Sequence, residues 1–103
     1  MPQFVVIARD AKDEGALERR LAVREAHIKA CDLAVETGQQ IYGAALLSED
    51  GKMCGSVMVF EMESRAVLDD YLKNEPYVTN KVWGEIEIIP CKTGPSFTKF
   101  LPQ

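Results

Sequence analysis

Three side chains that could bind anions or transfer protons lie close together in the sequence: Arg20, Arg24 and His27. Their spacing of four and then three residues places them on one side of a helix. Two guanidinium groups beside an imidazole would suit an anion site in which the histidine acts as a general base or acid. We expect these cations to lower the pKa of His27 and to keep its ring neutral.

The helix that carries these groups is expected from about residue 14 to residue 37, where Gly38 would end it. On a helical wheel, Arg24 falls inside an apolar stripe, and Arg20 and His27 lie on its border. The stripe is expected to be buried and consists of Leu17, Leu21, Ile28, Cys31 and Val35. A guanidinium in such a stripe needs a partner, either a carboxylate in an internal salt bridge or an anionic ligand.

A carboxylate that could serve the histidine occurs in the run Asn74-Glu75-Pro76-Tyr77. Pro76 disfavours helix at Glu75, so the carboxylate would be presented from an extended backbone. The alternative is an ordinary solvated helix end. Cys31 follows His27 by four residues, so a thiolate nucleophile is conceivable, although a cysteine in an apolar stripe is more often inert.

The remaining candidates are three residues that could line a pocket or simply pack in the core: Tyr42, Met58 and Trp83. Short β-branched runs and turn residues predict strands over 4–8, 41–47, 56–62 and 82–89, with helices over 14–37 and 64–73. The order β-α-β-β-α-β is that of the ferredoxin-like α+β fold, an antiparallel four-stranded sheet with two helices on one face. We expect one domain over residues 1–103, with a core of about 3–92 and a C-terminal tail of 93–103.

The first and third strands carry apolar residues on both faces, which predicts that they are central in the sheet. Two helices cover only one face, so the second face would be open and partly apolar. We expect the same face of a second subunit to cover it in a twofold homodimer. The alternative is that the tail folds back over this face through Phe97, Phe100 and Leu101.

Composition argues against several other classes of protein. The chain has 103 residues, is 47% hydrophobic and carries a net charge of −4 without a basic run, so we expect no nucleic-acid or membrane partner. No signal peptide or membrane span is evident, and three widely spaced cysteines fit free thiols in the cytoplasm. The chain contains one histidine and no glycine-rich phosphate loop. We therefore expect neither a metal site built by the protein nor a nucleotide cofactor.

The run Leu17-Glu18-Arg19-Arg20-Leu21-Ala22-Val23-Arg24-Glu25-Ala26-His27 resembles the signature of the YciI-like (YCII-related) family. Further matches are the turn at Gly38, the pair Gly55-Ser56 and the run Glu75-Pro76-Tyr77-Val78. Together they extend from the first strand to about Lys92. The arginine–histidine block is the most specific of them.

This resemblance implies a dimeric α+β barrel with facing sheets and a histidine–aspartate active site. The family histidine falls on His27 and its arginine on Arg24. The aspartate position holds Glu75, whose extra methylene would move the carboxylate by about 1.5 Å, and Glu25 stands where a proline commonly follows the arginine.

The residues and the resemblance together predict a cofactor-free enzyme for proton transfer, of lyase, isomerase or dehydratase type. Its substrate would be a small anionic molecule, cyclic or phenolic. His27 would be the acid or base, Glu75 would orient its ring, and Arg24 with Arg20 would bind the anion. The alternatives are a non-catalytic dimeric ligand-binding or accessory module and a cofactor-free monooxygenase-like enzyme.

Overall fold

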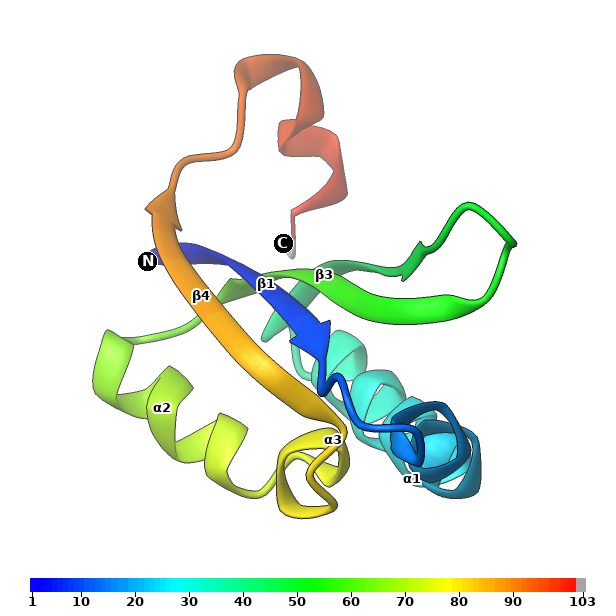
Figure 1. Cartoon of the computed structure of the whole chain (residues 1–103). Coiled ribbons are helices and arrows are strands. Elements are labelled where there is room, and N and C mark those ends of the chain that lie inside the picture. The colour runs from blue at the N-terminus through cyan, green and yellow to red at the C-terminus, as the bar shows by residue number, and fades with distance from the viewer. Residues whose placement is uncertain (102–103) are drawn as a thin grey trace.

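The computed structural model describes residues 1–101 as an α+β fold with four strands, three α-helices and a 3-10 helix (Figure 1). The elements are β1 (Gln3–Asp10), α1 (Ala16–Glu36), β2 (Gln40–Leu47), β3 (Met53–Glu61), α2 (Arg65–Lys73), α3 (Pro76–Thr79), β4 (Trp83–Cys91) and η1 (Pro95–Phe100). The predicted ferredoxin-like order is therefore confirmed. The single turn α3 and the helix η1 were not expected.

The sheet has the strand order β2-β3-β1-β4, and every neighbouring pair is antiparallel. β1 and β3 are central, as their two apolar faces predict. In the register, Val6 lies opposite Met58 of β3 on one side and Ile88 of β4 on the other. One apolar row therefore crosses the middle of the sheet.

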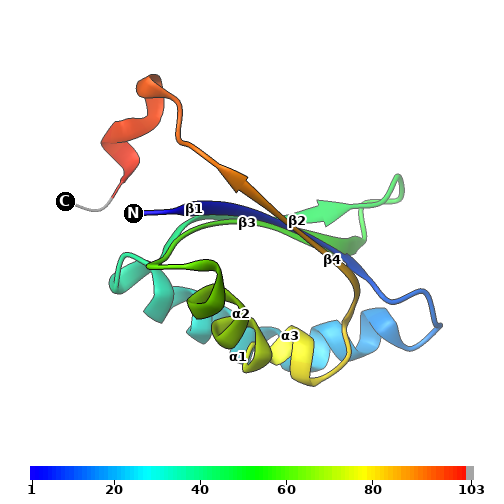
Figure 2. The same cartoon turned by 90° about the vertical axis from the view of Figure 1, so that its left-hand side faces the viewer.

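The core lies between this sheet and the helices, all three of which cover the same face (Figure 2). Alternate residues of β1, namely Phe4, Val6 and Ala8, point into it and are almost fully buried. Met58 and Phe60 of β3 join them. This alternation is what a strand with one face on the core requires.

Local signals account for the ends of the helices and for the hairpin. Gly38 follows α1 with a φ of 80°, and Gly51 adopts a φ of 82° in the turn between β2 and β3. Glycine adopts this left-handed conformation without a side-chain clash. At the start of α2, the Ser64 side chain accepts a hydrogen bond of 3.2 Å from the backbone N–H of Val67, which caps the helix.

The predicted buried face of α1 is only partly correct, because Leu17 and Cys31 are half-buried but the other three residues of the stripe are exposed. Leu21, Ile28 and Val35 are 55%, 37% and 59% exposed, whereas Arg20 and Ala34 are buried. The helix is turned in this way because Asp10 and the end of β3 offer polar partners to the Arg20 guanidinium. A helical wheel records only the spacing of apolar residues, so it does not predict the burial of Arg20 by polar partners.

The sheet face opposite the helices is mostly open (Figure 2). Val5, Ile7, Val57 and Val59 lie on it and are half-buried. The tail stands over one end of it, where Phe97 shares a groove with residues that include Val59. The tail is tied down by Gln3, whose side-chain oxygen accepts 2.7 Å hydrogen bonds from the N–H and hydroxyl of Thr93. Among residues 1–101, no helix has the length and apolar character needed to cross a membrane.

Candidate active site

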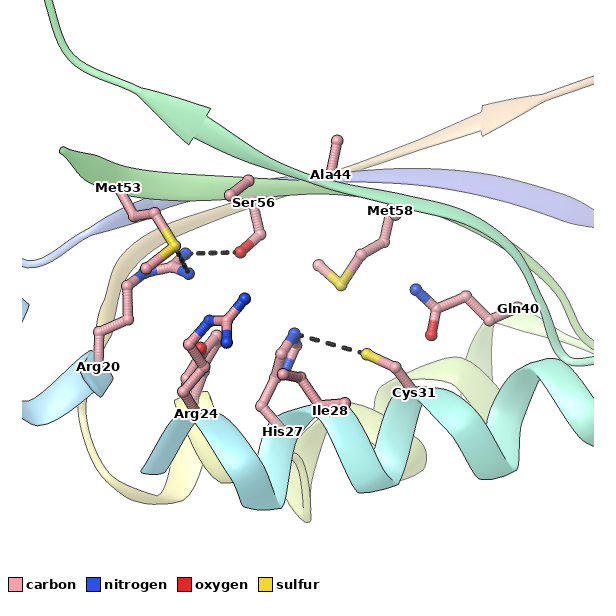
Figure 3. A pocket seen from close by; sticks show the side chains of 13 residues that line it. Arg20, Arg24, His27, Ile28, Cys31, Gln40, Ala44, Met53, Ser56 and Met58 are labelled. Carbon is pink, nitrogen blue, oxygen red and sulfur yellow. Dashed lines mark hydrogen bonds between the residues drawn. The ribbon is translucent and has the colours of Figure 1, made fainter. Parts of the chain in front are cut away.

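A cavity of about 300 Å³ lies between α1 and the half of the sheet formed by β2 and β3 (Figure 3). Helix α1 supplies its floor, and the strands supply its roof. Its lining includes Arg20, Arg24, His27, Cys31, Gln40 and Met58. A volume of this size is at the lower end of the range for small-molecule sites.

The imidazole of His27 is bound to Glu75, which comes from the far end of the fold. Nδ1 of the ring lies 2.8 Å from Oε2 of the carboxylate, and Glu75 is only 3% exposed. The second oxygen, Oε1, accepts a 2.9 Å hydrogen bond from the backbone N–H of Tyr77. Glu75 is thus the N-cap of α3, with Pro76 as the first helical residue. Proline suits that position, and it keeps the preceding residue extended.

Aromatic rings fix the plane of the imidazole. The Tyr77 ring stacks on His27 with centroids 3.9 Å apart and an interplanar angle of 12°. Trp83 meets the imidazole edge-on at 6.1 Å. The second ring nitrogen, Nε2, lies 3.5 Å from Sγ of Cys31 at the cavity wall. The ring therefore links a buried carboxylate to a thiol.

The protonation of His27 differs from the expectation. Burial of the ring lowers its pKa, but the hydrogen bonds to Cys31 and Glu75 and the charges of both groups outweigh this and raise the pKa to about 9. The prediction that the arginines keep the ring neutral is wrong, because Arg20 is paired and Arg24 is exposed to solvent. Near neutral pH the ring is an imidazolium.

Arg20 is the arginine that the fold buries, with 2% of its surface exposed. Its guanidinium donates to Asp10 at 2.9 Å, to the backbone oxygen of Gly55 at 2.6 Å and to the hydroxyl of Ser56 at 2.7 Å. It also lies 4.6 Å from the centroid of the Tyr77 ring. These contacts make Arg20 a structural cation beside the cavity, in an internal salt bridge of the kind that was one alternative for Arg24.

Arg24 reaches the cavity from an exposed position on α1, between Arg20 and His27 (Figure 3). Within residues 1–101, no carboxylate forms an ion pair with it. Its guanidinium is therefore the one that an anion entering the cavity would meet.

Of the three other residues predicted to line the pocket, one lies at this cavity and two lie elsewhere. Met58 lies on the cavity wall. Tyr42 is 60% exposed and lines the groove on the opposite side of the sheet, because its place on β2 puts it in register with Val59 of the open face. Trp83 is 7% exposed and packs in the core against the imidazole. The prediction that Tyr42 lines this cavity is thus wrong. Trp83 does not line the cavity either, but it packs against the imidazole from the core.

Sequence reasoning missed Gln40 and Tyr77. Gln40 is 5% exposed; its Nε2 donates to the backbone oxygen of Tyr42 at 3.3 Å, and its Oε1 has no hydrogen-bond partner. A Cβ at Gly43 would lie 2.9 Å from that Nε2, so the glycine leaves room for the amide. A polar residue at the start of the apolar strand 40–47 was the available signal. No three of the His, Cys, Asp and Glu side chains between residues 1 and 101 are grouped as a metal site.

Residues 3–92 match the YCII-related domain family. The chain belongs to this family. It is 27% identical over 95 residues to the protein YciI of Escherichia coli O6:H1 (strain CFT073), an alignment that covers 86% of this chain and 95% of that protein.

Two solved structures share the fold of this YCII-related chain. One is a 5-chloro-2-hydroxyhydroquinone dehydrochlorinase from Burkholderia phenoliruptrix AC1100 in complex with 2,5-dihydroxybenzoquinone, with a TM-score of 0.77 at 20% identity, covering 91% of this chain and 97% of that one. The other is a dimeric ferredoxin-like protein of unknown function from Jannaschia sp. CCS1, with a TM-score of 0.50 at 15% identity, covering 90% and 100%. These likenesses concern the fold.

Proposed function

We propose that this chain is a small enzyme that transfers protons without a cofactor, in a lyase, isomerase or dehydratase reaction on a small anionic ring compound. The observation that carries the proposal is the imidazole of His27, which opens to a cavity through one nitrogen and is held by the buried carboxylate of Glu75 through the other. A ring oriented in this way by a carboxylate is a common arrangement for general acid–base catalysis.

The raised pKa of His27 supports a first role as a general acid. Near neutral pH the imidazolium acts as a general acid and donates its Nε2 proton to a substrate oxygen or to a leaving group. The resulting neutral ring then accepts a proton from the substrate, which completes an elimination or an isomerisation. The carboxylate of Glu75 stabilises the protonated ring before this transfer and fixes its orientation throughout.

Arg24 binds the negative charge of the substrate. Its guanidinium lies at the cavity without an ion-pair partner among the described residues, so an anion can replace water there. Met58 provides an apolar wall, which suits the face of a ring. The fold shared with a dehydrochlorinase that was solved with a quinone supports a ring-shaped substrate.

The test uses 5-chloro-2-hydroxyhydroquinone and measures chloride release, together with a panel of hydroxylated ring carboxylates followed by NMR in D₂O. We expect turnover with at least one compound and a loss of about 10²–10⁴-fold in His27→Gln. The matched control is Lys29→Gln, on the exposed side of α1, which should keep full activity. Equal rates for His27→Gln and the wild type would refute the proposal. Oxygen consumption would instead favour a monooxygenase, and binding without turnover an accessory module.

We also propose that two copies pair through the open sheet face. The half-buried valines and isoleucine of β1 and β3 lie there beside exposed polar residues of β4, and pairing would remove this apolar surface from water. A related fold is described as dimeric, which supports the same arrangement.

A further inference from the structure

We propose that Cys31 is a second reactive group of the cavity, a nucleophile paired with the imidazole of His27 and positioned to add to the electron-poor carbon of an α,β-unsaturated carbonyl ligand. This activity is a covalent addition and differs from the proposed elimination or isomerisation. The ligand class follows from the nucleophile, because a soft thiolate attacks conjugated carbon readily.

The first support is a chain of three groups. The carboxylate of Glu75 lies 2.8 Å from Nδ1 of His27, and Nε2 of the same ring lies 3.5 Å from Sγ of Cys31. A nucleophile beside a base that a third group orients is the geometric signature of nucleophilic catalysis. The other two cysteines, Cys54 of β3 and Cys91 of β4, are exposed and do not line the cavity.

The electrostatics agree with this geometry. The hydrogen bond to Cys31 and the hydrogen bond and charge of Glu75 raise the pKa of His27, so the ring holds the proton that it later returns to the ligand. Cys31 is half-buried at the cavity wall, so a small ligand reaches its sulfur while the surrounding side chains restrict larger ones.

A second, independent observation points to a ligand beside this sulfur. Gln40 is only 5% exposed and lines the same cavity, and its Oε1 has no hydrogen-bond partner. Figure 3 shows its amide group directed into the cavity from the side opposite Arg24, next to Cys31. A buried acceptor without a partner is unfavourable, and a ligand hydroxyl or N–H would satisfy it. The ligand therefore carries a donor at this end and its carbonyl toward Arg24.

The addition balances without an oxidant or reductant. The sulfur electron pair of Cys31 forms a bond to the β-carbon while the π electrons of the C=C bond move to the carbonyl oxygen. The enolate charge faces the guanidinium of Arg24. The imidazolium of His27, which holds the former thiol proton, then protonates the α-carbon. The sum is addition of S–H across the double bond, and the reverse sequence releases the ligand.

The test measures the alkylation of Cys31 by N-ethylmaleimide at pH 7, using Cys54→Ser/Cys91→Ser protein and intact mass spectrometry. We expect alkylation to be at least tenfold faster than that of N-acetylcysteine under the same conditions, because the imidazole beside the sulfur accepts and returns the proton. In His27→Gln the rate should fall at least tenfold. A parent-protein rate no faster than that of N-acetylcysteine would overturn the proposal, whatever the fate of the variant.

The hydroxyl contact to Gln40 is tested by the ratio of rates for N-(2-hydroxyethyl)maleimide and N-ethylmaleimide. We expect a ratio of several-fold in the parent protein and a ratio near one in Gln40→Met, which keeps the length of the side chain without its polar atoms. The same ratio in both proteins would contradict the role of Gln40. Neither assay depends on turnover, so a failure of the proton-transfer function leaves both results interpretable.

Discussion

Replacing Glu75 with glutamine removes the buried charge beside His27 while keeping an oxygen that can still accept from the N–H of Tyr77. The wild-type ring should titrate with a pKa of about 9, against 6.5 for an unperturbed histidine. The pKa in Glu75→Gln should be lower by at least one unit, because both the charge and the charge-assisted hydrogen bond are lost.

The same shift sets a dependence of stability on pH. At 1.36 kcal/mol per unit, a difference of about 2.5 units corresponds to roughly 3 kcal/mol, and solvent screening of the partly exposed ring lowers this contribution. Because the folded pKa lies above the unfolded one, this contribution is fully present below about pH 6.5. It decreases as the pH rises and is lost once the pH passes about 9. The difference in unfolding free energy between the wild type and Glu75→Gln should shrink over the same interval.

The assay is proton NMR of the imidazole Hε1, which is unambiguous because the chain contains one histidine. Urea denaturation at pH 6 and pH 10 gives the accompanying free energies. Glu25→Gln is the matched control, since it removes an exposed carboxylate from the same helix and should move the His27 pKa by less than about 0.3 units. A wild-type pKa at or below 6.5 would show that the carboxylate does not hold the proton, and the argument for an imidazolium would fail.

Three further outcomes are expected. Arg20→Gln should lower the unfolding free energy by about 3–5 kcal/mol in urea denaturation, because it leaves the buried carboxylate of Asp10 unpaired; a loss under 1 kcal/mol would contradict the structural role of Arg20. Arg24→Gln should change stability by no more than about 0.5 kcal/mol, yet weaken the binding of an anionic substrate at least tenfold in calorimetry; unchanged affinity would exclude it from the anion site. Val57→Glu, on the open face, should convert a dimer into a monomer of half the mass in light scattering, and a monomeric wild type would refute pairing through this face.

The sheet is the part of the fold that local sequence patterns predict best. Apolar residues on both faces of a strand indicate that both faces are covered, as they are at the centre of a sheet. The central positions of β1 and β3 therefore follow from the pattern of apolar and polar residues alone. The rotation of α1 could not be predicted in this way. Arg20 points inward because Asp10 and Ser56 lie where it can reach them, and those partners are close only once the sheet has formed.

The candidate site was likewise predicted only in part. The family resemblance and the local effect of Pro76 suggested a histidine facing a carboxylate, and the structure brings His27 and Glu75 within 2.8 Å. The sign of the histidine pKa shift was wrong because it depends on which charges remain unpaired after folding. Gln40 was missed for a related reason, since an unsatisfied amide oxygen is a property of the packed cavity.

The carboxylate of Glu75 carries two duties, one oxygen for the first turn of α3 and the other for the imidazole. The proton affinity of the ring and the integrity of that turn are therefore a single coupled equilibrium. A motion that unwinds α3 also frees the carboxylate that stabilises the protonated ring of His27. A ligand that displaces this carboxylate removes the hydrogen bond of the Tyr77 N–H. The hydrogen exchange of the Tyr77 backbone N–H should therefore follow the protonation state of His27.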